Sequence, residues 1–251
     1  MSPLPPLSPN ASLRYDVVRR LLPDGPATVL EVGCGMGGVG ARLAQRYRYL
    51  GLEPDPLSCA VAVGRLSAAG GTGEIRNADL SGLRDDERFD LVCAFEVLEH
   101  IEDDQTALKE WVERLKPGGQ LLLSTPAHQD RFGPADTMAG HFRRYDPEVM
   151  ATRLAEAGLV DQQIVLYGMP LGYLLEAGRN AVGRRRIKRA GGDGGDIAER
   201  TSGSGRLLQP ANRLVGTAIK VGTSPFRLVQ RAFPHHGPGL VAAARKPGSV
   251  V

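Results

Sequence analysis

Residues 29–38 read Val-Leu-Glu-Val-Gly-Cys-Gly-Met-Gly-Gly, an apolar run followed by closely spaced glycines. Its apolar first half predicts a buried strand, and its glycines form a turn that leads into a predicted helix over residues 39–47. Glycine lets the backbone approach a ligand closely, and a turn before a helix directs free amide groups at the ligand's polar atoms. Because nucleotide-binding folds of several kinds share such a loop, the loop alone indicates only a nucleotide-like ligand or a tight turn.

Short apolar runs alternate with helical patterns on both sides of this loop. Strands are predicted over residues 28–32, 49–53, 74–76, 89–94, 120–125, 162–167 and 240–244. Helices are predicted over residues 13–22, 39–47, 57–69, 104–115 and 147–157. This alternation predicts βαβ units, and therefore an α/β fold with a doubly wound, seven-stranded and mostly parallel sheet.

Two polar positions follow the next predicted strands. Glu53 ends the second strand about twenty residues after the glycines, where a carboxylate can accept hydrogen bonds from both hydroxyls of a ribose. Asp79 follows the third strand, where a polar side chain would meet the edge of an adenine. Either acid alone would pass for an ordinary surface residue, but together with the loop they favour an adenosine-containing ligand.

Four segments, residues 29–38, 51–55, 89–101 and 115–126, resemble motifs of the class I S-adenosylmethionine-dependent methyltransferases, in particular those of type 11/12. The resemblance covers roughly residues 14–170, in order and at the spacing of the family. It implies S-adenosylmethionine as the cofactor and a Rossmann-like methyltransferase fold whose last strand is antiparallel. The cofactor-binding residues that it implies are Glu31, Gly33, Cys34, Gly35, Gly37, Glu53, Pro54, Asp79, Leu80, Phe95 and Glu96. A nicotinamide-binding loop would instead have the spacing Gly-x-Gly-x-x-Gly.

A candidate metal site follows the fourth predicted strand. Glu96, Glu99 and His100 lie three and four residues apart, so they converge if a helical turn begins there, and His141 follows the fifth strand in a polar loop. This set is similar to the ligands of metal-dependent small-RNA 2′-O-methyltransferases and of some ubiquinone-pathway O-methyltransferases. It implies Mg²⁺ or another divalent metal gripping a vicinal diol. The alternative is that Glu96 flanks the cofactor, Glu99 and His100 begin a helix, and the loop at 143–145 packs over the cleft.

The candidate catalytic residues are His141, His128 and Glu99. Methyl transfer is an in-line attack on the sulfonium methyl group, so the protein mainly positions and deprotonates the acceptor. A metal would lower the pKa of an acceptor hydroxyl, whereas without a metal an imidazole is the natural general base. A histidine in a loop is often incidental, and this alternative applies most strongly to His128.

The 251 residues predict a domain formed by residues 1–177 and 236–251, with residues 178–235 inserted as a basic helical cap. The insertion carries twelve basic and three acidic residues, a formal charge of +9 that leaves −6 for the rest. Helices are predicted over residues 171–189 and 212–233, and residues 191–205 are polar enough to be partly disordered. The cap would be a solvated face, a surface for anionic lipid or a lipid-linked sugar, or an RNA-binding surface. Aromatic residues form only 5% of the chain, which makes nucleic acid the least favoured partner.

The sequence therefore predicts an O-methyltransferase acting on a hydroxylated small molecule such as a sugar, a glycolipid precursor or a secondary metabolite. The rivals are a metal-dependent RNA 2′-O-methyltransferase and a catalytically silent S-adenosylmethionine-binding module that docks partners through its basic insertion. No run of about 18 apolar residues occurs, and the first residues lack the pattern of a secretory signal. The predicted location is the cytoplasm, with peripheral contact at the inner membrane face, and no motif predicts an oligomeric state.

Overall fold

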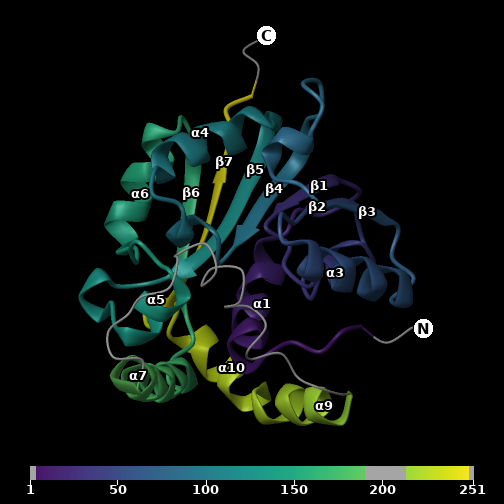
Figure 1. The fold of residues 1–251 in the computed structure, drawn as a ribbon. Coiled ribbons are helices and arrows are strands. Elements are labelled where there is room, and N and C mark those ends of the chain that lie inside the picture. Colours follow the sequence, from purple (N-terminus) through teal and green to yellow (C-terminus); the bar gives the residue numbers. More distant parts are fainter. Residues whose placement is uncertain (1–3, 190–212, 249–251) are drawn as a thin grey trace.

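The computed structural model describes residues 4–189 and 213–248, and in them seven strands form a single sheet in the order β3-β2-β1-β4-β5-β7-β6 (Figure 1). The strands are β1 (Thr28–Val32), β2 (Arg48–Leu52), β3 (Gly73–Arg76), β4 (Phe89–Phe95), β5 (Leu115–Pro126), β6 (Val160–Tyr167) and β7 (Gly239–Arg245). Strands β1 to β5 pair in parallel, whereas β7 runs antiparallel to both β5 and β6. The predicted doubly wound sheet with an antiparallel last strand is confirmed.

Helices cover both faces of this sheet, because neighbouring residues of a strand point to opposite sides. Val29 of β1 packs with residues of α1, α2 and α3, whereas Leu30 packs with residues of α4 and α6. These helices are α1 (Pro9–Leu21), α2 (Gly40–Leu43), α3 (Pro56–Ala68), α4 (Asp104–Glu113) and α6 (Pro147–Glu156). One apolar core therefore lies on each face of the sheet. The edge at which the parallel strands end is not covered by these cores, and the predicted site lies there.

Three helical elements differ from the sequence prediction. The helix predicted over residues 39–47 is the single turn α2, and a short helix, α5 (Pro134–Ala139), was not predicted. The helix predicted over residues 212–233 is divided into α9 (Arg213–Gly222) and α10 (Ser224–Ala232), because Pro225 lacks the N–H that would continue the helix of α9. Short 3₁₀ turns cover Leu80–Gly82, Leu98–His100 and Gln129–Arg131.

The predicted helical segment before the last strand is present as α7 (Leu171–Arg189), α9 and α10. Each of these three helices contacts α1, and Figure 1 shows them along the lower edge of the molecule, below α1 and α5. The disorder predicted for residues 191–205 lies outside the described residues. Within the described ranges no helix is long and apolar enough to cross a membrane.

Candidate active site

The glycine loop after β1 is closely packed at two positions and open at the one between them. Gly33, Gly35 and Gly37 have φ angles of +66°, +53° and +72°, which L side chains rarely adopt. A Cβ at Gly33 would lie 2.7 Å from Cγ2 of Val97, and one at Gly37 would lie 3.0 Å from Cα of Ala62. A Cβ at Gly35 would meet no atom of the described residues within 4 Å. Space for a ligand therefore opens at Gly35.

Glu53 lies directly against this open position. Its Oε2 accepts a hydrogen bond from the Gly35 amide at 2.7 Å, and its Oε1 accepts one from the Asp55 amide at 3.0 Å. The Asn77 side chain donates to the backbone oxygens of Glu53 and Pro54, at 2.8 and 3.0 Å, which fastens the segment after β3 to the segment after β2. The structure thus brings the predicted ribose-binding acid to the glycine loop.

The predicted adenine-side residues lie on the turn after β3. Asp79 accepts a hydrogen bond from the Ser81 amide at 2.9 Å and thereby begins the 3₁₀ turn that contains Leu80. Hydrogen bonding from the side chain and the amide of Ser81 lowers the pKa of the Asp79 carboxyl group. Leu80 is partly buried against the core, so this turn offers one apolar and one acidic side chain at the rim of the site.

Glu31 and Cys34 lie beneath the loop. The Tyr49 hydroxyl donates to Glu31 at 2.6 Å, and burial raises the pKa of Glu31 to about 7. Burial likewise raises the pKa of the Cys34 thiol, with the charges of Glu31 and Glu53 adding to the effect. Cys34 is a free, buried cysteine like Cys59 and Cys93, and all three pack as small apolar residues.

Glu96 follows Phe95, the buried last residue of β4, and it is oriented by α1. With φ at +59°, Glu96 directs its Oε1 to Arg14 of α1 at 3.1 Å and to the Ser124 hydroxyl at 2.9 Å. Burial opposes ionisation of Glu96, but the Arg14 guanidinium and this hydrogen bond hold its pKa below the usual value. Sequence reasoning missed Arg14, although its place beside the buried Leu13 was a signal that its guanidinium faces the interior and meets an acid there.

Glu99, His100 and His141 form a cluster next to Glu96. Each of these three side chains offers one atom that could bind a metal, and the three atoms lie within 4.8 Å of one another. The centroids of the His100 and His141 rings are 4.6 Å apart, and the rings meet edge to face. Glu99 is fully buried, and neither of its carboxylate oxygens has a hydrogen-bond partner in the described part of the chain. Burial, with the charge of Glu96, raises the pKa of Glu99 well above its usual value. Burial and the neighbouring His141 lower the pKa of His100 to about 4.

The structure corrects the predicted metal set in one respect: Glu96 does not join the cluster. A helical turn was expected from Glu96 onward, but the chain forms a 3₁₀ turn only over Leu98–His100, and the left-handed conformation of Glu96 sends its carboxylate to Arg14. Three of the four predicted ligands therefore converge.

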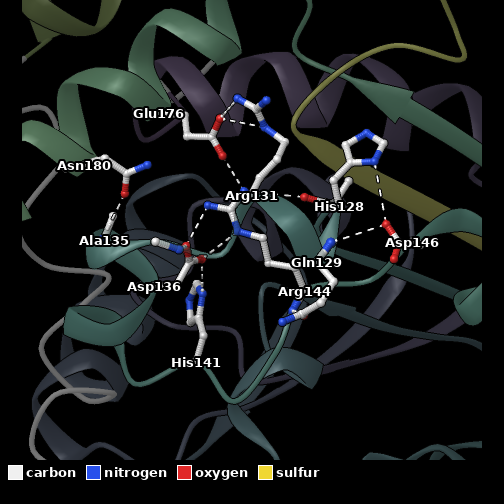
Figure 2. A network of polar contacts seen from close by, with 12 residues as sticks. His128, Gln129, Arg131, Ala135, Asp136, His141, Arg144, Asp146, Glu176 and Asn180 are labelled. Atoms are coloured by element: carbon white, nitrogen blue, oxygen red, sulfur yellow. Dashed lines mark hydrogen bonds and ion pairs between the residues drawn. The ribbon is translucent and has the colours of Figure 1, made fainter.

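His141 belongs to a buried polar network that the sequence did not reveal (Figure 2). Its Nδ1 lies 2.8 Å from Oδ1 of Asp136 in α5, and Asp136 also accepts hydrogen bonds from Nε and Nη2 of Arg144, at 2.9 and 2.7 Å. Arg144 in turn contacts Glu176 of α7, which also binds Arg131. Sequence reasoning missed Asp136 because the short helix that carries it was not predicted.

The structure separates His128 from this cluster. Figure 2 shows His128 pointing toward Asp146 and away from His141, and its Nδ1 lies 3.8 Å from Oδ1 of Asp146. His128 lines a different, open cleft with residues such as Ile164 and His235, and none of the predicted cofactor residues lines that cleft. The prediction of His128 as a catalytic base is therefore not supported by its position, whereas His141 lies at the cluster.

Comparison with known proteins identifies the family. A profile of the methyltransferase domain matches residues 11–164, more than half of the chain. The chain belongs to this methyltransferase family. Its motifs and fold are those of the class I S-adenosylmethionine-dependent enzymes, as the resemblance in the sequence implied.

Several curated relatives of this methyltransferase share only part of their length with it. It is 34% identical over 100 residues to the ubiquinone biosynthesis O-methyltransferase of Pseudomonas fluorescens, a match that covers 39% of this chain and 43% of the relative. It is 31% identical over 114 residues to the trans-aconitate 2-methyltransferase of Streptomyces avermitilis, covering 43% and 42%. It is 26% identical over 121 residues to the norajmaline N-methyltransferase of Rauvolfia serpentina, covering 45% and 40%. The matches thus span less than half of each relative.

Solved structures share the fold of the methyltransferase. The YcgJ protein of Bacillus subtilis superposes with a TM-score of 0.62 at 15% identity, covering 96% of this chain and all of that one. The N-methyltransferase NodS of Bradyrhizobium japonicum, in complex with S-adenosyl-L-homocysteine, gives a TM-score of 0.53 at 19% identity, covering 93% and 85%. At these identities the likeness establishes the fold.

Proposed function

We propose that this methyltransferase transfers the methyl group of S-adenosylmethionine to a hydroxyl oxygen of a small molecule such as a sugar, a glycolipid precursor or a secondary metabolite. We also propose that Glu99, His100 and His141 hold a divalent cation beside that oxygen. The observation that carries the proposal is the buried Glu99 carboxyl group, which lacks a hydrogen-bond partner among the described residues and lies next to two imidazoles. Ubiquinone biosynthesis O-methyltransferases among the relatives, at 32–34% identity, support an oxygen acceptor.

The residues present fit a cation. A buried carboxyl group without a partner costs free energy, and a divalent cation that binds one of its oxygens offsets that cost. Asp136 engages Nδ1 of His141, which leaves Nε2 of the same ring for a metal, and carboxylates commonly orient metal-binding histidines in this way. One carboxylate and two imidazoles suit Zn²⁺, Mn²⁺ or Fe²⁺ better than Mg²⁺, which prefers oxygen ligands.

Residues of this chain would position the cofactor and the acceptor, and they would accept the proton of the acceptor hydroxyl. The glycine loop and Glu53 hold the cofactor at the carboxyl edge of β1 and β2, and the Glu96–Arg14 pair forms the adjacent wall. A bound cation would lower the pKa of an acceptor hydroxyl and fix its orientation. Without a cation, His141 accepts the hydroxyl proton, and Asp136 stabilises the imidazolium that forms. The acceptor oxygen then attacks the sulfonium methyl group, and S-adenosylhomocysteine leaves.

The experiment compares Glu99→Gln with Glu102→Gln, which changes an exposed acid three residues further along the chain. Metal content after dialysis against Mn²⁺ or Zn²⁺ is measured by mass spectrometry, and methylation of catechol-type diols and sugars is measured with and without EDTA. We expect Glu99→Gln to lose the bound metal and on the order of 100-fold in rate. Its affinity for S-adenosylhomocysteine should stay unchanged, and Glu102→Gln should behave as wild type.

Three outcomes would contradict parts of this proposal. If no metal binds and EDTA leaves the rate unchanged, the cation is wrong while oxygen methylation stands. If the protein binds S-adenosylhomocysteine but methylates no hydroxylated acceptor, a silent cofactor-binding module is the better description. If methyl groups appear instead on the 2′-oxygens of an RNA oligonucleotide, the acceptor class is wrong.

A further inference from the structure

Helix α10 buries the polar Gln230 beside the partly buried Phe226, while it exposes the apolar Leu228 and Val229 to solvent. Gln230 is 2% exposed, its side-chain amide donates to the Leu13 carbonyl at 3.0 Å, and its oxygen accepts from the Gly168 amide at 3.1 Å. On the opposite side of the same helix Leu228 is 64% exposed, and Phe233, which follows the last residue of the helix, is 43% exposed. A surface helix of a globular protein ordinarily turns polar side chains outward and apolar ones inward, so the exposed Leu228 and the buried Gln230 need an explanation.

The same feature continues on the two helices that accompany α10. Val221 of α9 and Leu174 of α7 are about two-thirds exposed. Val182 and Ile187 of α7 are exposed as well. Single exposed apolar residues are common on proteins, but a group of them on one layer of helices marks an interaction surface. We call the outward side of α7, α9 and α10 the helical layer.

The charges of the helical layer have one sign. Its exposed basic side chains are Arg179, Arg184, Arg185, Arg186, Lys188, Lys220 and Arg231. The acidic residue of these three helices, Glu176, is buried and bound to Arg131 and Arg144, so it does not offset the positive charge at the surface. Arg231 pairs with Asp16, whereas Arg184, Arg185 and Arg186 have no ion-pair partner among the described residues. The layer therefore presents apolar and cationic groups together.

We propose that the helical layer docks onto an anionic phospholipid membrane, with α9 and α10 lying in the plane of the head groups. Leu228, Phe233 and Val221 would enter the boundary of the acyl chains, and the arginines and lysines would contact lipid phosphates. No described helix is long and apolar enough to span a bilayer, which fits an in-plane arrangement. The layer lies at the edge toward which β4 and β5 run, so docking would turn the mouth of the site toward the lipid (Figure 1).

Two other occupants fit the layer less well. A second copy of the chain on the same surface would bring two sets of unpaired arginines together, and like charges oppose such a contact. Single-stranded RNA binds through stacked aromatic side chains as well as cations. The aromatic residues of these helices, Tyr173 and Phe226, are partly buried, and the exposed Phe233 follows α10. Anionic lipid satisfies both the apolar and the cationic groups.

The test uses the full chain and sedimentation with phosphatidylcholine vesicles that contain either no anionic lipid or about 30% phosphatidylglycerol. The variant is Leu228→Glu, and its matched control is Leu57→Glu in α3, because both leucines are 64% exposed and Leu57 lies outside the helical layer. We expect the wild type to bind the anionic vesicles at least about tenfold more tightly than the neutral ones, and to lose that binding as NaCl rises from about 0.1 M to about 0.5 M. Leu228→Glu should weaken binding at least about fivefold, and Leu57→Glu should leave it unchanged.

A second variant tests the charge separately from the apolar contact. The triple change Arg184→Gln, Arg185→Gln and Arg186→Gln should weaken binding to anionic vesicles roughly tenfold or more. Equal loss in Leu228→Glu and Leu57→Glu, or no vesicle binding by the wild type, overturns the proposal. A dimer in solution that Leu228→Glu dissociates, or RNA binding without vesicle binding, also overturns it. Since vesicle binding is measured without turnover, its failure is distinguishable from failure of the proposed methyl transfer.

Discussion

Glu31 shows how one carboxyl group makes the stability of the fold depend on pH. Burial raises the pKa of Glu31 to about 7, whereas in the unfolded chain the group titrates near its ordinary value of 4.5. Between these two values the folded protein holds a proton that the unfolded chain has released. This proton stabilises the fold fully below about pH 4.5, and the stabilisation is lost as pH rises through 7.

Glu31→Gln should remove this dependence while it keeps an oxygen that accepts the hydrogen bond from Tyr49. Urea unfolding at pH 5 and pH 8 gives the measurement. Over that interval the wild type should lose on the order of 2–3 kcal/mol more free energy of unfolding than the variant loses. Parallel changes in the two proteins would show that Glu31 is already ionised at pH 5 in the folded state.

Other residues of the site differ in how far the sequence could predict them. The glycines at positions 33, 35 and 37 indicate a backbone with positive φ, because other residues rarely adopt that conformation. The loop was therefore predictable from the local sequence. The partner of Glu96 was not, because Arg14 lies 82 positions earlier in the chain and no local pattern joins the two. Ion pairs between distant elements depend on packing that single-sequence patterns do not encode.

At the scale of elements, a comparison of Gly35 in the glycine loop with Gly25 in another turn distinguishes effects on folding from effects on ligand binding. Gly35 and Gly25 both have positive φ, and a Cβ at either position would meet no described atom within 4 Å. Gly25 lies in the exposed turn before β1, whereas Gly35 lies against Glu53. Alanine at either position should therefore cost the same backbone strain, about 1 kcal/mol.

Gly35→Ala and Gly25→Ala should nevertheless differ in cofactor binding. Isothermal titration with S-adenosylhomocysteine should show at least about a tenfold loss of affinity for Gly35→Ala, because the new methyl group occupies the open part of the loop. Gly25→Ala should bind as the wild type does. If both variants bind equally well, the ligand does not approach the backbone at Gly35.

The elements that the sequence predicted well are those with a strong internal period. All seven strands were predictable, since each combines an apolar run with turn residues at its ends. Helix α5 has only six residues and no apolar period, and it begins where Asp136 accepts a hydrogen bond from the Gly133 amide at 2.8 Å. The break between α9 and α10 carried a visible signal in Gly222 and Pro225, which the amphipathic pattern across both helices outweighed.

At the scale of the whole molecule, the buried network joins α7, in the helical segment before the last strand, to the segment that follows β5. Glu176 of α7 lies between Arg131 and Arg144, and Arg144 is buried as well. Glu176→Gln would leave the two guanidinium groups with one buried carboxylate, that of Asp136. Because removal of one partner strands a buried charge, we expect a loss of about 3 kcal/mol in the free energy of unfolding.

Asp86→Asn is the control for this prediction, since it removes a carboxylate from an ion pair with Arg84 in which both side chains are exposed. Its cost should be less than about 0.5 kcal/mol by chemical denaturation. Losses of similar size in Glu176→Gln and Asp86→Asn would mean that the network is open to water in solution.

The connection from Glu176 through Arg144 and Asp136 to His141 also limits how such a protein can diversify. Substitutions on the outward side of α7 leave this chain of contacts intact, so they can change the surface of the helix without disturbing the cluster. The inward position of Glu176 differs, because its replacement would remove the carboxylate that binds both Arg131 and Arg144. Directed evolution of a new specificity would therefore succeed most readily in libraries that hold Glu176, Arg144 and Asp136 fixed.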